Sequence, residues 1–545
     1  MLGKRFCLVW VVLAALGGIF GPVTAQGRSI ITIDFQQELD TLNPLYTGMW
    51  FMTTAADMYL SPPWYIDDTL TPVPALVTEI PSAANGLISE DNRSITLKLR
   101  DDIVWSDGEP ITADDFVFTY EMLVSPNNAP DTRYPYDEKI ESVVAADERT
   151  VVVTYTEPFA PWLTNTFHDF PPIPAHILRP VFEAEGTIDN AAWNRAADVV
   201  SGPFKPVEWV AGSHIAFERN ENYWGEPAKF DGVFMRFVPE DATVVASLVS
   251  GDTDVGTFIA YSDTPALEDA GVNIELVNSG YNEGWFLNFD PETANPAMLD
   301  VNVRKAIVLA FDRDKFNQDI NLGKTYTPAS FWEGTPYKDP DSAPLPYDPD
   351  MANQLLDEAG WVDSNGDGVR DKDGVELVLR HITNQRQIRK DLQVIAQQQL
   401  AEVGIKLEIE NYDSNIFFGG YADDAPMAKG RFDIAELSDV GDFPDPNVSR
   451  FLCSQIPSED NPSGYNDQHY CNEQVDALFT EQAQTVDFDK RVELFHEIDR
   501  LMNADIAWAG IWYDPDLWAI NSRISNTRVS GADPLWNIAG WEVSG

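Results

Sequence analysis

Four carboxylates stand within nine positions, directly before an apolar run, and side chains of this type could take part in catalysis. They are Asp107, Glu109, Asp114 and Asp115, in the stretch WSDGEPITADDFVFTYEML. Paired carboxylates can act as general acid and base, but no nucleophile or proton partner stands near them in the sequence. Thr112 precedes an apolar run and Asp115 follows three positions later, which is the spacing of a helix capping box. We therefore predict that SDGEP turns the chain and that Asp114 and Asp115 begin a helix that runs to about Leu123.

Other signatures of catalysis are missing from the sequence. It contains neither G-x-S-x-G nor H-E-x-x-H, and the GKT at Gly323 lacks the upstream glycine of a phosphate loop, because position 318 is Gln. His168 and His176 flank a proline-rich segment, where a lone histidine is more often structural than a general base. We predict no catalytic residue and no enzyme.

A possible cation site is the stretch DSNGDGVRD, Asp363 to Asp371. Oxygen-bearing residues occupy positions 1, 3, 5 and 9 of a calcium loop, and Gly368 occupies position 6. Position 12, where a bidentate Glu normally closes the shell, is Gly374. The segment is therefore either a structural calcium site or a polar turn between a helix ending at Gly360 and the following strand.

Two cysteines, Cys453 and Cys471, stand 18 positions apart in a loop rich in Pro, Ser, Asn and Asp. In an oxidising compartment we expect them to form a disulfide. A metal site needs more ligands, and His469 is the only histidine nearby. We predict no metal there.

The composition is that of an acidic globular protein. The apolar fraction is 44%, the aromatic fraction 12% with 16 Trp, and the net charge is -52. Such a field repels phosphate backbones, so we expect no nucleic-acid partner. A cationic or zwitterionic ligand, solubility in salt, or simply a solvated acidic surface would each fit. At 545 residues, two or three domains are expected.

The first 25 residues have the pattern of a secretory signal. Lys4 and Arg5 are followed by the apolar run Phe6 to Phe20 and by the small-residue site VTA before Gln26. We expect this signal peptide, 1–25, to be cleaved and the protein to be periplasmic or extracellular. The alternative is an uncleaved anchor.

Strand and helix patterns alternate along the remaining chain. Strands are expected at SITLKLRDDIVW and at FKPVEWVAGSHIAFERN, where two strands join through Ala211-Gly212. Helices are expected at DATVVASLVSG, VRKAIVLAFDRDKFNQDI, DPDMANQLLDEAG, RQIRKDLQVIAQQQLAEVG and DFDKRVELFHEIDRLMNA. The fold class is α/β.

Four of these segments, taken in order, resemble the blocks of one family. LKLRDDIVWSDGEPITADDFVFTYEML is similar to its W/F-x-D-G-x-P turn and F-T-A-x-D-V helix, and SGPFKPVEWVAGSHIAFERNENYWG to its G-T-G-P-Y to R-N-x-x-Y-W-G block. VRKAIVLAFDRDKF resembles V-R-x-A-x-x-x-A-I-D-R, and DPDMANQLLDEAGW resembles A-x-x-L-L-x-E-A-G-W. The family is that of the peptide-type (family 5) extracytoplasmic solute-binding proteins of ABC importers.

The resemblance implies a two-lobed periplasmic-binding-protein fold of the cluster C type, with an extra small domain inserted in the first lobe. We place the first lobe at 26–71, 196–283 and 513–545, the inserted domain at 72–195, and the second lobe at 284–512. GYNEGWFLNFD and AGIWYDPDLWAI would then cross between lobes. The implied mechanism is capture of a ligand by closure of the lobes, followed by recognition by a permease.

The resemblance also implies ligand-binding residues. In peptide-binding members an Asp in a segment like D-Y-x-x-P pairs with the ligand's α-ammonium, and GDFPDP puts Asp442 at that place; the alternative is a turn acid before prolines. Asp439 stands where peptide binders often carry Trp, so either an aromatic wall is missing or the cleft suits another ligand. Family position places five aromatics at the cleft, each with core packing as the alternative: Tyr46, Trp50, Trp285, Trp512 and Tyr513.

The leading hypothesis is a monomeric, non-catalytic binding protein for short peptides. Members of the same family bind oligosaccharides, opines or chelated metal, and these ligands remain alternatives. A secreted carbohydrate-active enzyme is an alternative of another class, and it would need two carboxylates facing each other across a cleft. A sensory protein that passes its ligand signal to a receptor is the third.

Overall fold

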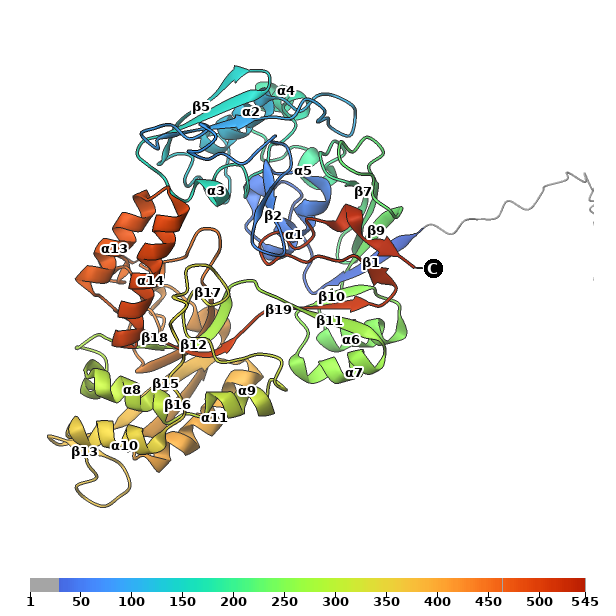
Figure 1. The fold of residues 1–545 in the computed structure, drawn as a ribbon. Helices are drawn as coiled ribbons and strands as arrows, with labels where there is room; N and C mark the ends of the chain where they lie inside the picture. Colours follow the sequence, from blue (N-terminus) through green and yellow to red (C-terminus); the bar gives the residue numbers. More distant parts are fainter. Residues whose placement is uncertain (1–28, 463, 545) are drawn as a thin grey trace, which may run out of the picture.

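The computed structural model describes residues 29–462 and 464–544. The predicted signal peptide, 1–25, lies outside the described residues. Three sheets organise the chain. We call the part built on the seven-stranded sheet the first lobe, the part built on the three-stranded sheet the inserted domain, and the part built on the five-stranded sheet the second lobe. Figure 1 shows the inserted domain at the top, the first lobe to the right and the second lobe at the lower left. No helix in the described part of the chain has the length and apolar character needed to cross a bilayer.

The first lobe is built on a seven-stranded sheet in the order β11-β19-β10-β1-β9-β8-β7. Its central strand β1 pairs in parallel with both β9 and β10. Its strands are β1 (Ile30–Phe35), β7 (Phe204–Val210), β8 (His214–Arg219), β9 (Gly232–Phe237), β10 (Val255–Thr257), β11 (Val272–Val277) and β19 (Asp516–Asn521). The lobe also holds α1 (Trp50–Tyr59), α6 (Asp241–Ser250), α7 (Thr264–Asp269) and the short strands β2 (Trp64–Ile66), β3 (Pro72–Pro74), β20 (Ile524–Ser525) and β21 (Glu542–Val543). As predicted, β7 and β8 form a hairpin through Ala211-Gly212, and α6 ends at Gly251, whose φ of 80° suits glycine.

The inserted domain carries the acid-rich stretch. Its sheet has the order β4-β6-β5, with β4 at Ser94–Lys98, β5 at Ile140–Asp147 and β6 at Thr150–Tyr155. Its helices are α2 (Ala113–Val124), α3 (Trp162–Asn165), α4 (Ala175–Glu185) and α5 (Trp193–Ala196). The strand predicted from Ser94 to Trp105 ends at Lys98, because its partner β6 begins opposite at Thr150.

The predicted capping box begins α2. The Thr112 hydroxyl accepts a hydrogen bond from the backbone of Asp114, and the Asp115 carboxylate accepts one from the backbone N–H of Thr112 at 2.8 Å. Asp115 also accepts from the backbone of Ala175 at 3.0 Å, which joins α2 to α4. The carboxylate of Asp107 contacts His176 at 2.9 Å. These contacts confirm that the acids have a structural role.

The second lobe is built on a five-stranded sheet in the order β16-β15-β17-β12-β18. Its strands are β12 (Tyr281–Leu287), β15 (Val378–Asn384), β16 (Lys406–Tyr412), β17 (Ile434–Val440) and β18 (Trp508–Tyr513), with β13 (Asp371–Lys372) and β14 (Val375–Glu376) as a separate pair. Its helices are α8 (Val301–Leu309), α9 (Arg313–Asp319), α10 (Pro349–Glu358), α11 (Gln387–Glu402), α12 (Ser414–Phe417), α13 (Glu473–Gln484) and α14 (Phe488–Asp505). The single helical stretch expected at 303–320 is two helices, because Asp312 leaves the helical conformation and caps α9 through the backbone of Lys315.

The chain crosses between the two large sheets at residues 278–280, from β11 to β12, and at residues 514–515, from β18 to β19. The crossings lie side by side, because the Asp514 N–H donates to the Tyr281 carbonyl at 3.0 Å. The second crossing lies within AGIWYDPDLWAI, as the resemblance implies, whereas the first lies just before the marked segment GYNEGWFLNFD and shares only Gly280 with it. Two adjacent extended strands of this kind are the geometry of a hinge.

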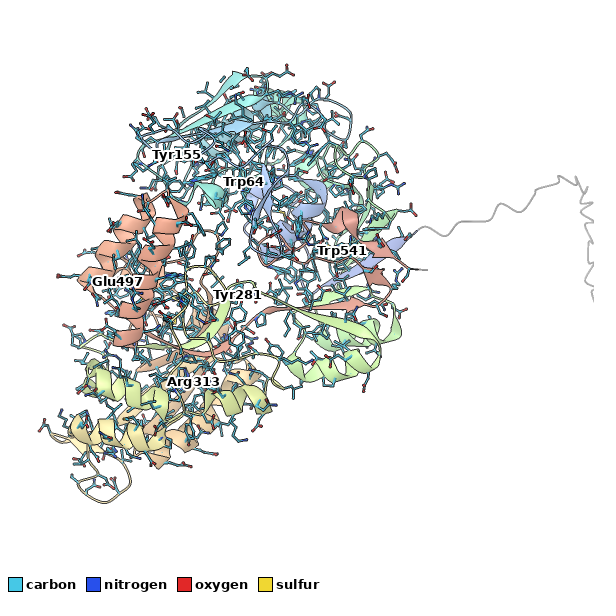
Figure 2. The ribbon with its side chains drawn as sticks, in the orientation of Figure 1. Trp64, Tyr155, Tyr281, Arg313, Glu497 and Trp541 are labelled. Atoms are coloured by element: carbon cyan, nitrogen blue, oxygen red, sulfur yellow. A yellow bond between two sulfur atoms is a disulfide. The ribbon has the colours of Figure 1, made fainter. Side chains whose placement is uncertain are left out.

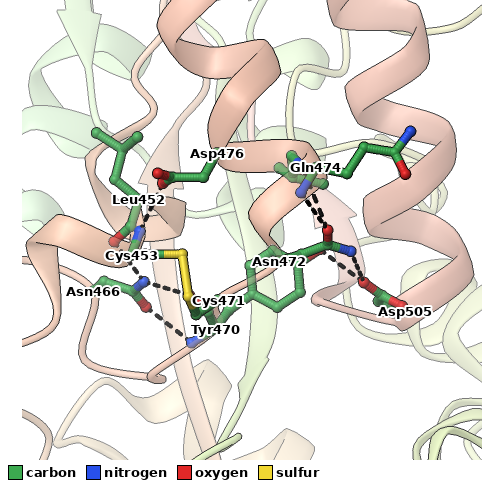
Figure 3. The surroundings of a disulfide bond; sticks show 10 residues. Leu452, Cys453, Asn466, Tyr470, Cys471, Asn472, Gln474, Asp476 and Asp505 are labelled. Carbon is green, nitrogen blue, oxygen red and sulfur yellow. Dashed lines mark hydrogen bonds between the residues drawn. A yellow bond between two sulfur atoms is a disulfide. The ribbon is translucent and has the colours of Figure 1, made fainter.

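The predicted disulfide is present. Cys453 and Cys471 are bonded at the base of the loop that leads into α13 (Figure 3). The Cys453 N–H donates to Asp476 on α13, and Asn472, directly after Cys471, caps α13 through the backbone of Gln474. The disulfide therefore holds the loop 453–471 against the first turn of a helix whose far end reaches the cavity described next.

Candidate functional site

A cavity of about 650 Å³ lies between the lobes. The first lobe contributes Trp50, the crossing 278–280 and residues 531–532. The inserted domain contributes residues between Tyr134 and Asp169. The second lobe contributes Tyr281, the loop 440–449, the end of α13 and Arg491 on α14. Tyr281, labelled at the centre of Figure 2, is 38% exposed at this junction. A contact between the backbones of Ala160 and Ala483, at 3.1 Å, joins the inserted domain to the second lobe beside the cavity.

The loop that carries Asp442 is shaped by close packing. A Cβ at Gly441 would lie 2.7 Å from the Phe331 carbonyl oxygen, so only glycine fits there. The Gly441 N–H donates to the carbonyl of Gly280 in the crossing, at 3.0 Å. Asp442 follows with a φ of 50° and lines the cavity. The position of this acid is thus coupled to the hinge.

Asp442 has no partner for its charge. Among the described residues no group donates a hydrogen bond to its carboxylate and no cation pairs with it, although it is largely surrounded by protein. Burial, followed by the charges of Asp445 and Asp169, raises the pKa of Asp442 to about 7. A buried carboxylate of this kind is stabilised by a cation that enters the cavity.

A second acid on the same loop has a partner. The guanidinium of Arg491 pairs with Asp445, and its Nε donates to the side chain of Gln482 at 2.8 Å. Burial raises the pKa of Asp445, against the opposing effect of Arg491. Asp445 lines the cavity and neutralises the arginine.

The wall opposite contains a histidine held between two acids. His168 lies 3.0 Å from Asp169 through Nδ1 and 3.1 Å from Asp533 through Nε2. Burial alone would lower the pKa of His168, but the two carboxylates raise it well above its usual value. The imidazolium then donates to both acids, so His168 is a satisfied charged group of the wall.

The predicted aromatic residues divide between cavity and core. Trp50 lines the cavity and packs edge-on against Phe258, with ring centroids 4.9 Å apart. Tyr46 points elsewhere, since its hydroxyl donates to Asp189 at 2.8 Å. Tyr513 packs behind the wall, where it stacks on Tyr326.

Trp285 and Trp512 lie in the core of the second lobe instead of the cavity wall. Both are fully buried, Trp285 stacked on Phe311 and Trp512 stacked on Phe316. Their strands β12 and β18 are neighbours in the sheet, and these side chains point into the helices packed against it. The placement expected from family position is corrected for these two residues.

Position 439, where the resemblance implies a tryptophan, carries an acid with ionic partners. Asp439 pairs with the buried Arg450, which also contacts Asp467 at 3.2 Å and stacks on Tyr465. Burial raises the pKa of Asp467 to about 6 even with Arg450 beside it. An ionic cluster therefore supports the strand before Asp442, at the place where the resemblance leads one to expect an aromatic residue.

The calcium-like loop satisfies its own acids. The two oxygens of Asp363 accept from the backbones of Gly366 and Gly368, at 2.7 and 3.0 Å, and Ser364 donates to Asp371. In the residues that the structure describes, no group of three or more His, Cys, Asp or Glu side chains is arranged to hold a metal ion. Bound calcium at this loop stays a prediction.

Most lining residues were not predicted from the sequence, among them these with charged or aromatic side chains: Tyr134, His168, Asp169, Tyr281 and Arg491. They come from different parts of the chain, and no spacing rule links them. Only the proline-rich surroundings of His168 marked an unusual segment. The arrangement brings several carboxylates and aromatic rings around one enclosed space, which suits a ligand with a positive charge and an apolar part.

Comparison with known sequences is consistent with this geometry. The model of the family described as "Bacterial extracellular solute-binding proteins, family 5 Middle" matches residues 71–455, more than half of the chain. The oligopeptide-binding protein AppA of Bacillus subtilis is 26% identical over 458 residues, which cover 82% of this chain and 80% of that protein.

Solved structures share the fold. AppA from Bacillus subtilis in complex with a nonapeptide superimposes with a TM-score of 0.68 at 23% identity, covering 94% of this chain and 99% of that one. NikZ from Campylobacter jejuni in complex with Ni(L-His) gives a TM-score of 0.74 at 21% identity, covering 95% and 100%. The same architecture thus accommodates a peptide in one protein and a metal chelate in another.

Proposed function

Because the chain belongs to the bacterial extracellular solute-binding proteins of family 5, we propose that it captures short peptides between its lobes and delivers them to the permease of an ABC importer. The observation that carries the peptide assignment is Asp442, a carboxylate without a cation in the cavity between the lobes. A peptide's α-ammonium group would supply that cation. Removing one partner of such an enclosed pair typically costs about 2–5 kcal/mol of binding free energy.

Closure of the lobes is the mechanism of capture in this proposal. The crossings at 278–280 and 514–515 form the hinge, and the Asp442 loop is bonded to one of them through Gly441. A ligand that contacts both sides of the cavity stabilises the closed state, because it binds that state more tightly than the open one. The permease then recognises the closed state. Peptides are suited to this role because their amino end and side chains can contact both lobes.

The other ligand classes are less well supported. An anionic metal chelate would meet Asp442 and Asp169 in the same cavity and be repelled. An oligosaccharide would use Trp50 and Tyr281 for stacking, and its hydroxyl groups would donate hydrogen bonds to Asp442 but would not neutralise its charge. We further propose that the protein is exported by a cleaved signal peptide, acts as a monomer and performs no catalysis.

Calorimetric titration with a panel of ligands tests the assignment. The panel contains tri- to pentapeptides, a set of oligosaccharides and Fe(III)-EDTA as the anionic metal chelate. The proposal expects micromolar or tighter binding of peptides and none of the others. Binding of a saccharide or the chelate in preference to every peptide would overturn it, and hydrolysis of a saccharide by pure protein would favour the enzyme alternative.

A further inference from the structure

A second cavity of about 200 Å³ adjoins the first. The two share His168, Asp169 and Ala532 in their walls. The remaining wall of the second cavity comes mainly from α1 and from Asp533 of the first lobe. A ligand in the first cavity therefore lies beside a smaller space that belongs to the first lobe and the inserted domain.

One face of α1 runs along both cavities. Trp50 lines the first cavity, and Thr53 and Asp57 line the second. These residues are spaced i, i+3 and i+7, so they lie on the same face of the helix. At 1.5 Å per residue, Asp57 is about 10 Å along the helix from Trp50. This face of α1 thus forms one continuous wall that passes from the first cavity to the second.

The charges of the two cavities do not balance. Five carboxylates line them: Asp57, Asp169, Asp442, Asp445 and Asp533. The cations among the lining residues are His168 and Arg491. Arg491 pairs with Asp445, and His168 is shared by Asp169 and Asp533. Within the described residues this leaves one carboxylate in each cavity without a cation, Asp442 in the first and Asp57 in the second.

Asp57 has the environment of a binding carboxylate. Its Oδ2 accepts the backbone N–H of Leu535 at 3.0 Å, and no described group donates to its Oδ1. Burial, followed by the charge of Asp533, raises the pKa of Asp57 well above its usual value. The backbone N–H of Leu535 and the charge of His168 oppose this effect only in part.

Asp533, across from Asp57, is held in place by the fold. Its side chain is 8% exposed, and its Oδ2 accepts from the backbone of Ile66 at 2.5 Å and from His168. No described group donates to its Oδ1. The second cavity therefore presents one fixed acid and one acid whose charge has no counterion.

We propose that the second cavity is a subsite for a second positive charge on the ligand, an ammonium or guanidinium group that pairs with Asp57. This inference rests on the proposed function: the first charge is the α-ammonium at Asp442, and the second is a Lys or Arg side chain of the same peptide. The protein would then select basic peptides. The shared chemistry is a ligand with two cationic nitrogen groups, which a linear polyamine also has.

The test is a thermodynamic cycle measured by calorimetric titration. Tripeptides with Arg at each position in turn are compared with analogues that carry citrulline, which has the same shape without the charge. For at least one position, we expect the wild-type protein to bind the Arg peptide at least about tenfold more tightly, as an enclosed charge pair implies. In Asp57→Asn the difference should fall below about threefold.

Asp198→Asn is the matched control. Asp198 is exposed and lies outside both cavities, so this variant should keep the full preference for Arg. If Asp57→Asn does not fold, which its thermal melt would show, Thr53→Lys takes its place: Thr53 is exposed and lines the second cavity, so a lysine there should supply the cation and abolish the preference for Arg.

Each outcome separates this inference from the proposed function. Tight binding of peptides without preference for Arg at any position would overturn the second-charge subsite and leave the peptide function intact. Binding of spermidine, weakened by Asp57→Asn, with no binding of any peptide would support the subsite and overturn the peptide function. An equal preference for Arg in wild type and Asp57→Asn would show that another group binds the charge.

Discussion

Asp442 of the second lobe and Asp169 of the inserted domain line the same cavity, and the charge of Asp169 is one of the causes that raise the pKa of Asp442 to about 7. Like charges on opposite walls oppose closure of an empty cavity. A cation between them reverses the sign of that interaction. Ligand charge and lobe closure are therefore coupled in this molecule.

The first prediction concerns Asp442 itself. Asp442→Asn should weaken binding of peptides with a free amino end by at least about tenfold, because the ammonium loses its charged partner. The same peptides with an acetylated amino end should bind wild type and variant alike. Titration calorimetry measures both, with Asp198→Asn as the control for a charge change outside the cavity. Equal losses for free and acetylated peptides would refute the ammonium role.

Binding should depend on pH through the same group. A cationic ligand favours the ionised carboxylate, so binding releases the proton that Asp442 holds below a pKa of about 7. Affinity should therefore rise by about fivefold from pH 6 to pH 8 and fall again at higher pH, where the ligand's own α-ammonium, with a pKa of about 8, loses its proton. Titrations in buffers of different ionisation enthalpy count the protons released. In Asp442→Asn this contribution to the pH dependence should disappear.

The disulfide should contribute to stability rather than to ligand contact. It closes 18 positions of chain, Cys453 to Cys471, and replacing both residues with Ser should lower the free energy of unfolding by about 3 kcal/mol. Denaturant titration measures that change. Intact mass before and after alkylation of the oxidised protein should show no free thiol at these positions, and two alkylated thiols there would contradict the pairing.

The aromatic residues should separate into two classes. Trp512→Ala should lower the free energy of unfolding by about 3–5 kcal/mol, because it empties a fully buried position. Trp50→Ala should mainly weaken ligand binding, because that ring lines the cavity. Denaturant melts and titration of the same two proteins distinguish the effects. A loss of affinity in a fully folded Trp512→Ala protein would return that residue to the site.

Local sequence signals predicted the elements well where one short segment contains the whole cause. The capping box of Thr112 and Asp115 is present as expected, and Gly251 ends its helix. Predictions failed where the cause lies elsewhere in the chain. The strand from Ser94 ends at Lys98 because its partner strand β6 begins at Thr150, opposite that residue. Asp312 divides the expected helix into α8 and α9, although the apolar pattern continues through it.

The site was harder to predict than the elements. Asp442 and Trp50 were expected at the cleft from family position, and both line the cavity. Trp285 and Trp512 were expected there too, but an aromatic residue on a crossing strand has two faces available, and only packing decides between them. The contact of His168 with Asp533 spans 365 positions, so no local pattern could have indicated it.

The central claim is that a short peptide occupies the cavity between the lobes, and native mass spectrometry of the protein purified from the cells that make it tests this most directly. The intact complex is weighed first, and the released ligand is then identified after denaturation. The account predicts a set of short peptides with free amino ends. Release of an oligosaccharide or a metal chelate would contradict it and would leave Asp442 without its proposed partner.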